Sequence, residues 1–198
     1  MSVRVKGQQS GNWEIGLGDS VGGSSFVNTT GDDPWVETNT YDFTLKYSSM
    51  TGLATFQVVG TGFTSALLTT PDYSIVGWGF TGIDLGLVTR AASTTRPATT
   101  LTLSDLILNG SSIGSSSYNG TTSYATNALY TGSVLSEINL TGKFNMTGDY
   151  LGNNEGTKFD LYLTGLRQVP TSVPEPGSLA LTALGLLGLG ATRRHKTA

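Results

Sequence analysis

Hydrophobic and polar residues alternate one by one along most of this chain, and this period of two is the strongest constraint on its fold. The clearest case is residues 41–47, where Tyr, Phe, Leu and Tyr at the odd positions are separated by Asp, Thr and Lys. Successive side chains of a β-strand point to opposite sides, so the pattern predicts a strand with one buried face. No stretch before residue 177 has a convincing helical period, which favours an all-β fold.

Further alternating runs extend this prediction over residues 11–169. A Met-Thr-Gly turn at residues 50–52 precedes a second run that contains Phe56 and Val58, so residues 41–60 are predicted to form a hairpin. Similar runs lie within residues 13–17, 76–87, 101–108, 138–146 and 159–163. About eight short strands with Gly, Asn and Asp turns predict an antiparallel β-sandwich or jelly-roll-like domain. We place this domain at residues 1–168, followed by a linker at 169–173.

The alternation is interrupted in two ways. Leucines at positions 101 and 103 share one face, whereas leucines at 106 and 108 have the other parity, so we expect a bulge or bend near Ser104-Asp105. Three polar stretches, residues 18–39, 89–100 and 109–126, are predicted to separate the strands. The last of these is rich in Ser, Gly and Thr, and we interpret it as a mobile loop.

The C-terminal residues 174–198 have a different composition. Pro174-Glu175-Pro176 is followed by 16 uncharged residues, 177–192, and then by a basic cluster of Arg193, Arg194, His195 and Lys196. As a helix the uncharged segment would be about 24 Å long, which is short of the roughly 30 Å hydrocarbon core of a bilayer. It is apolar on every face, which favours a short transmembrane helix. Because basic residues stay on the cytoplasmic side, the residues before the helix are expected outside.

These three parts together carry a family resemblance. Val173-Pro174-Glu175-Pro176, the short Leu/Gly/Ala segment and the basic cluster resemble the PEP-CTERM sorting signal of bacterial exported proteins. The resemblance implies a membrane processing enzyme of the exosortase type as a partner, and cleavage near the motif. It also implies association with exopolysaccharide and biofilm, and a location in the cell envelope or outside the cell. Residues 1–168 loosely resemble the all-β choice-of-anchor domains of such proteins.

Export requires an N-terminal signal, and the first ten residues do not supply one. They contain Arg4 and Lys6 but no apolar stretch behind them. We therefore expect a longer precursor that begins upstream of Met1. The alternative is a tail-anchored protein whose domain stays in the cytosol, which is disfavoured because the basic cluster follows the helix rather than preceding it.

Composition excludes several classes of chemistry. Residues 1–176 contain 8 Lys and Arg against 14 Asp and Glu, a net charge of 8 − 14 = −6, which argues against nucleic acid binding. The chain has no cysteine, which excludes disulfides and thiolate catalysis. His195 in the tail is the only histidine, so the domain cannot contain a Ser-His-Asp triad or a histidine metal site. We expect a non-enzymatic protein without cofactor or metal.

Two weaker chemical alternatives come from acidic stretches. Carboxylate pairs within residues 32–37 or 149–155 are candidates for glycoside hydrolysis. This is a remote alternative, because without a known geometry any two of the 14 acidic residues could be nominated. Residues 149–156 are rich in oxygen ligands for calcium, but their spacing does not fit an EF-hand, and turn formation is the better interpretation.

The leading hypothesis is an exported surface or extracellular-matrix protein, and the main alternative is a carbohydrate-binding β-sandwich module. For that alternative the candidate glycan contacts are Trp35, Tyr118 and Tyr124, which we place in or beside polar loops where their rings could stack on sugars. The competing interpretation of Trp35 is a loop anchor that packs on the end of the sandwich.

Overall fold

The computed structural model describes residues 1–7, 13–18, 27–31, 39–60, 63–69, 77–89, 91–92, 94, 98–119, 124–147 and 157–167. These residues form twelve strands and no helix, which confirms the predicted all-β class. In chain order the strands are β1 (Ser2–Gly7), β2 (Trp13–Gly18), β3 (Val27–Gly31), β4 (Tyr41–Ser48), β5 (Leu53–Gly60), β6 (Phe63–Thr69), β7 (Trp78–Val88), β8 (Thr100–Leu108), β9 (Ser111–Asn119), β10 (Tyr124–Leu135), β11 (Glu137–Thr147) and β12 (Lys158–Arg167).

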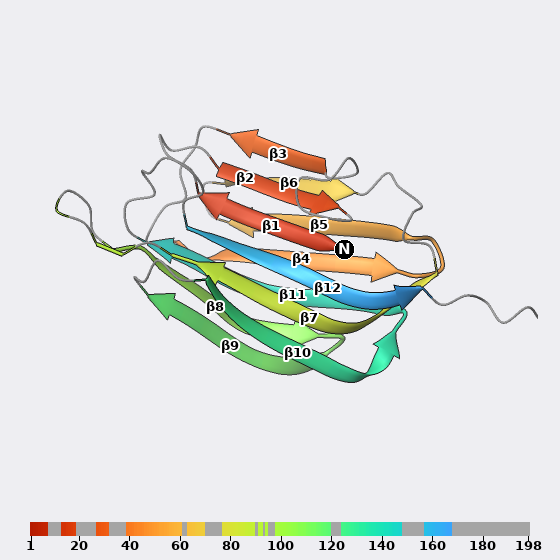
Figure 1. Ribbon diagram of the computed structural model, residues 1–198. Coiled ribbons are helices and arrows are strands. Elements are labelled where there is room, and N and C mark those ends of the chain that lie inside the picture. Colours follow the sequence, from red (N-terminus) through yellow and green to blue (C-terminus); the bar gives the residue numbers. More distant parts are fainter. Residues whose placement is uncertain are drawn as a thin grey trace, which may run out of the picture. The chain divides into compact units, whose positions relative to one another are not determined.

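The strands form two antiparallel sheets of six strands each (Figure 1). Sheet A has the order β10-β7-β12-β1-β2-β3, and sheet B has the order β6-β5-β4-β11-β8-β9. Strands that are consecutive in the chain pair in β1-β2-β3 and in β4-β5-β6. Other pairs join distant segments: β12 lies beside β1, and β11 lies between β4 and β8.

The core lies between the two sheets, as the alternation predicts. On β4, the side chains of Tyr41, Phe43, Leu45 and Tyr47 are buried, whereas the residues between them are half-buried or exposed. The same alternation occurs on β11. One continuous cluster of buried hydrophobic side chains includes residues from both sheets, so the predicted antiparallel two-sheet arrangement is confirmed for the described residues.

Phe159 of β12 connects the two halves of this core. Its ring centroid lies 5.5 Å from that of Phe43 and 5.2 Å from that of Phe144, and both of these residues belong to sheet B. Tilted aromatic pairs at such distances are favourable beyond the area that they bury. Phe159 is therefore a central contact between sheet A and sheet B.

A buried tyrosine adds a polar link between the sheets. The hydroxyl of Tyr47 on β4 donates a hydrogen bond of 2.8 Å to the carbonyl oxygen of Trp78 at the start of β7. Burial raises the pKa of this phenol from 10.0 to about 12, and the charge of Glu137 adds to the shift. The folded state holds the phenol proton of Tyr47 more tightly than the unfolded chain does. The resulting contribution of Tyr47 to stability is fully present below pH 10 and is lost as the pH rises towards 12.

Replacing Tyr47 with phenylalanine tests this link. Near neutral pH we expect the free energy of unfolding to fall by about 1 kcal/mol, the usual net value of one hydrogen bond. Between pH 10 and 12 the stability of the variant should decline less steeply than that of the native chain, because one raised pKa is gone. Urea unfolding midpoints measured from pH 10 to 12 give the pH dependence of stability for the variant and for the native chain. Equal pH dependence in the two proteins would contradict the raised pKa of Tyr47.

The predicted bulge near Ser104-Asp105 is confirmed. The pairing of β8 with β11 and with β9 changes register at this point, and Asp105 has a φ of 51°. The extra residue shifts the alternation of side chains by one position. The leucines at 101, 103, 106 and 108 are therefore all buried, although the first two and the last two have different parity.

Five of the twelve strands, β1, β3, β6, β9 and β10, were not predicted. β9 and the start of β10 lie within residues 109–126, which we predicted to be a mobile loop. That prediction was wrong for residues 111–119 and 124–126. Asn109 and Gly110, with φ of 49° and 84°, form a two-residue turn that joins β8 to β9. Positive φ at both positions is the hairpin geometry that Asn-Gly favours. The sheets therefore contain more than the eight strands we expected.

The described part of the chain holds no helix of the length and apolar character needed to cross a bilayer. The helix predicted at residues 177–192 lies outside the described residues.

Candidate functional site

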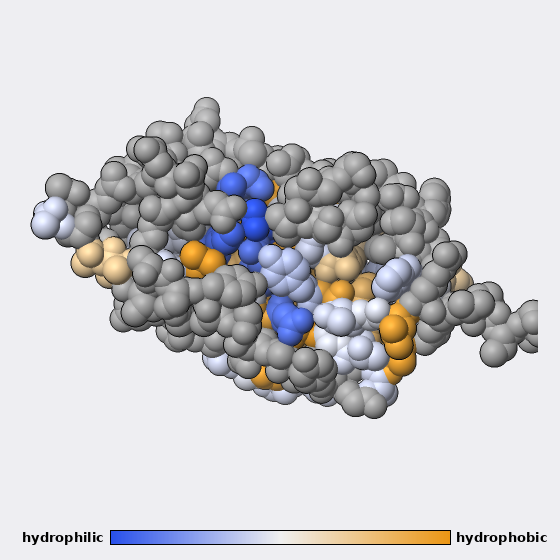
Figure 2. Space-filling view, in the orientation of Figure 1, coloured by the Kyte–Doolittle hydropathy of each residue, from blue (hydrophilic) through white to orange (hydrophobic). Residues whose placement is uncertain are grey.

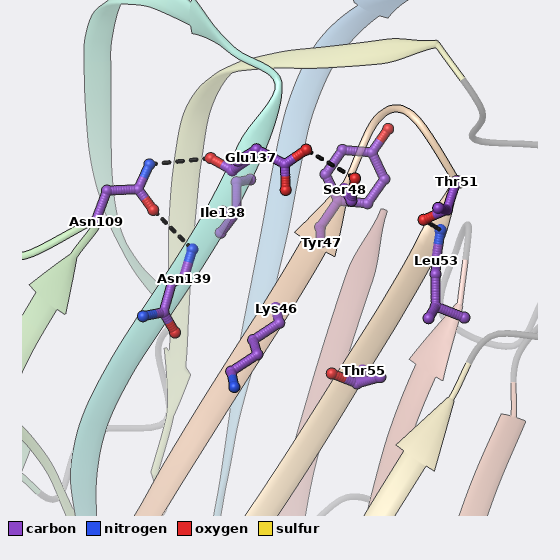
Figure 3. A pocket seen from close by; sticks show the side chains of 10 residues that line it. All are labelled: Lys46, Tyr47, Ser48, Thr51, Leu53, Thr55, Asn109, Glu137, Ile138 and Asn139. Atoms are coloured by element: carbon purple, nitrogen blue, oxygen red, sulfur yellow. Dashed lines mark hydrogen bonds between the residues drawn. The ribbon is translucent and has the colours of Figure 1, made fainter.

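The outer face of sheet B carries an open groove of about 510 Å³ (Figure 3). β4 and β11 form its floor, and it is bordered by β5 and by the turn between β8 and β9. Its lining is rich in hydroxyl, amide and charged groups, and the residues are Lys46, Tyr47, Ser48, Thr51, Leu53, Thr55, Asn109, Glu137, Ile138 and Asn139.

The pairing of β4 with β5 and β11 explains why these polar groups lie together. Lys46 is opposite Asn139 on β11 and opposite Thr55 on β5. One step along the strands, Ser48 is opposite Glu137. Directly opposed residues on one face of an antiparallel pair have Cβ atoms roughly 5 Å apart. The groove is thus the outward half of the same alternation that buries Phe43 and Leu45 in the core.

Hydrogen bonds hold several of these groups in place. The hydroxyl of Ser48 donates to Oε1 of Glu137 at 2.7 Å. The side chain of Asn109 donates to the carbonyl oxygen of Glu137 at 2.9 Å and accepts from the backbone N–H of Asn139 at 2.7 Å. Asn109 thereby fixes the β8–β9 turn to the start of β11. In Figure 3 the side chain of Lys46 extends beside Asn139 across the floor of the groove.

A second groove of about 560 Å³ follows along the same two strands. It is lined by Asp42, Phe43, Thr44, Asp105, Ile107, Ser112, Thr141, Gly142 and Lys143. Nζ of Lys143 donates a 2.8 Å hydrogen bond to Asp105, and this contact raises the pKa of Lys143. The outer face of sheet B therefore presents two successive grooves, each lined by a lysine and at least one carboxylate.

The outer face of sheet A is also charged, and several of its charges form ion pairs with one another. Nε of Arg4 donates to Oδ1 of Asp160 at 2.7 Å, and the hydroxyl of Tyr162 lies 3.3 Å from Oδ2. Lys6 and Glu14 form a further ion pair at 2.9 Å. Figure 2, which views this face, shows the hydrophilic residues as a band across its middle. Because Asp160 is 1% exposed and already has these partners, we assign it a structural role.

The candidate glycan contacts predicted from the sequence are not brought together as one described site. Trp35 lies outside the described residues. The backbone of Tyr118 belongs to β9 of sheet B and pairs with Leu101, whereas that of Tyr124 begins β10 of sheet A and pairs with Val88. Both tyrosines are therefore strand residues rather than loop residues, and they belong to different sheets.

The acidic stretches that contain Asp32, Asp33, Glu37, Asp149 and Glu155 lie outside the described residues. Within the described ranges, no group of three or more His, Cys, Asp or Glu side chains could hold a metal ion. The sorting motif Val173–Pro176 and the basic cluster Arg193–Lys196 also lie outside those ranges.

Sequence reasoning did not identify the groove on sheet B. Its residues Lys46, Asn139 and Glu137 look like ordinary surface positions of alternating strands, and only the pairing of β4 with β11 collects them. One local signal was present, because Asn-Gly at 109–110 is the strongest short-range indication of a hairpin. Reading it as a turn would have placed Asn109 at the end of the sheet.

Comparison with known families gives a match near the C-terminal end of the sequence. Residues 172–194 match the model of the PEP-CTERM protein-sorting motif, in agreement with the resemblance carried by Val173–Pro176 and the basic cluster. Comparison of the chain with curated proteins finds no match. The motif indicates an exported protein that is sorted to the cell envelope through exosortase, a membrane enzyme.

Proposed function

We propose, from the PEP-CTERM sorting motif at residues 172–194, that this protein is a non-enzymatic component of the cell surface or extracellular matrix. The sorting motif is the observation that carries the proposal. Exosortase would act near Pro174–Pro176, while residues 177–192 hold the chain in the membrane as a short helix. The β-sandwich of residues 1–168 is then the part delivered outside.

The composition of the groove supports binding rather than catalysis. Glycoside hydrolysis generally uses two carboxyl groups on either side of the scissile bond. Among the described residues that line the first groove, Glu137 is the one acidic residue, and it accepts a hydrogen bond from Ser48. The histidine of the sequence, His195, belongs to the tail. At the first groove these features favour binding over hydrolysis.

The same groove favours an exopolysaccharide as the partner of the domain. Hydroxyl, amide and ammonium groups can replace the water that hydrates sugar hydroxyls, and Ser48, Lys46 and Asn139 supply these groups along an open face. An open groove also suits a polymer, because it does not enclose the sugars that it binds.

Affinity electrophoresis of the full chain in gels that contain the host's extracellular polysaccharide tests this partner. Replacing Lys46 or Asn139 with alanine should weaken binding about fivefold each, the effect of losing one hydrogen bond of about 1 kcal/mol. Thr40→Ala is the matched control, because Thr40 is exposed but does not line either groove.

Three other results would reject the groove as the polysaccharide site. Native chain that is not retarded by the gel rejects polysaccharide binding altogether. Retardation that is unchanged in both groove variants rejects the location. Loss of retardation in Trp35→Ala, with the groove variants unaffected, would instead assign binding to the aromatic site predicted from the sequence.

A further inference from the structure

Six large hydrophobic side chains are exposed in the described part of the chain, and four of them gather at one end of the sandwich. These four are Met50, Leu53, Val134 and Leu166, with relative exposures of 84, 46, 44 and 68%. We call this surface the apolar end. Scattered exposed hydrophobic residues are ordinary, but several together at one place on a domain indicate a surface that contacts something.

Backbone contacts place these residues at the same end. The N–H of Ser49, next to Met50, donates to the carbonyl oxygen of Ser136 at 2.8 Å, and Ser136 closely follows Val134. The N–H of Gly77 donates to the carbonyl oxygen of Ser49 at 2.8 Å, which brings the start of β7 to the β4–β5 turn. Leu166 pairs with Gly79 near that start. Figure 1 shows β4 and β12 ending on this same side.

The chain leaves the domain at the apolar end. β12 ends at Arg167, one residue after Leu166, and the sorting motif begins at Val173. Six residues of fully extended chain span only about 20 Å. Leu166 is one residue farther from Val173, so whenever Val173 is at a membrane surface, Leu166 lies within about 25 Å of the lipid headgroups.

We propose that the apolar end rests on the lipid surface of the membrane while the sorting signal holds the chain there. This inference rests on the proposed function, because it requires residues 177–192 to be membrane-bound before processing. Exposed apolar side chains gain free energy by entering the boundary between headgroups and acyl chains. Met50 and Leu166 are exposed far enough to do so without any change in the fold.

The absence of cysteine from the chain permits a direct test. Full-length chain carrying Met50→Cys is labelled with an environment-sensitive dye and reconstituted into vesicles of phosphatidylethanolamine with a minority of phosphatidylglycerol. We expect a blue shift of the label, protection from iodide in the aqueous phase, and quenching by a lipid-borne quencher. Thr40→Cys is the control and should behave as a label in water, because Thr40 immediately precedes β4 and Met50 follows the other end of that strand.

Each other outcome overturns the proposal. If the chain binds the vesicles but the two labels respond equally, the apolar end does not contact lipid and only this inference fails. If the Met50→Cys label is protected from iodide but unaffected by the lipid quencher, a second protein copy covers the surface instead. If the chain does not sediment with the vesicles, the proposed membrane anchor fails as well. A second replacement, Leu166→Ser, should reduce the blue shift at Met50→Cys, and no reduction would contradict the proposed surface.

Discussion

Replacing Phe159 with alanine is expected to lower the free energy of unfolding by about 3–5 kcal/mol. Phe159 is 0% exposed, and its ring packs against Phe43 and Phe144 of the opposite sheet. Removing the ring takes away apolar contacts and leaves a cavity that the two sheets can close only in part. Since native domains are stable by about 5–15 kcal/mol, this single change should remove a large fraction of the total.

Urea unfolding of the full chain measures this effect. Leu166→Ala on the same strand is the matched control, because its side chain is 68% exposed and should change stability by no more than about 0.5 kcal/mol. A Phe159→Ala midpoint close to that of Leu166→Ala would show that the two sheets do not depend on this contact, and would contradict the described core.

Replacing Asp160 with asparagine is the second change with a large expected effect, again about 3–5 kcal/mol. Asparagine keeps the size of the side chain but removes the negative charge that faces Arg4. The Arg4 side chain is 12% exposed, so its guanidinium would lose this carboxylate in a place that water reaches poorly. Breaking a buried pair on one side is costly because the remaining charge has already been desolvated.

A matched control for Asp160→Asn is available on the same domain. Lys143 and Asp105 form an ion pair at 2.8 Å, close to the 2.7 Å of Arg4 and Asp160, but their side chains are 46 and 60% exposed. Asp105→Asn should therefore cost far less than Asp160→Asn, because water screens the exposed pair. Equal losses in the two variants, measured by urea unfolding, would show that burial does not set the strength of the Arg4–Asp160 pair.

The sequence permitted correct predictions where the information is local. The alternation of Tyr41, Phe43, Leu45 and Tyr47 predicted β4 and its buried face, because side chains on a strand alternate whatever the neighbouring strands are. The parity change around Ser104-Asp105 predicted the bulge for the same reason. These signals depend on a few consecutive residues and on nothing farther along the chain.

Strand β9 was missed for a physical reason that its position explains. It is an edge strand of sheet B, and its residues Ser111, Ser112, Gly114 and Ser115 are exposed. An edge strand that buries little needs little hydrophobic alternation, so its sequence resembles a loop. The groove was missed for a different reason, since Lys46 and Asn139 meet only through the non-local pairing of β4 with β11.

The C-terminal motif was predictable because its specificity lies in the order of its parts along the chain. Val173–Pro176, the uncharged segment and the basic cluster are recognisable without any knowledge of the fold, and the family match at residues 172–194 agrees with them. The domain before the motif has no such local signature. The proposed polysaccharide partner therefore rests on the groove of sheet B, whereas the proposed surface role and the destination rest on the motif.

The measurement that tests the central claim most directly is mass spectrometry of the mature protein from its native host. Export with exosortase processing predicts a chain recovered outside the cytoplasm that ends near Pro174–Pro176 and lacks Arg193–Lys196. An intact chain that still carries Arg193–Lys196 and stays in the membrane fraction would contradict processing. It would leave the C-terminal segment as a plain anchor.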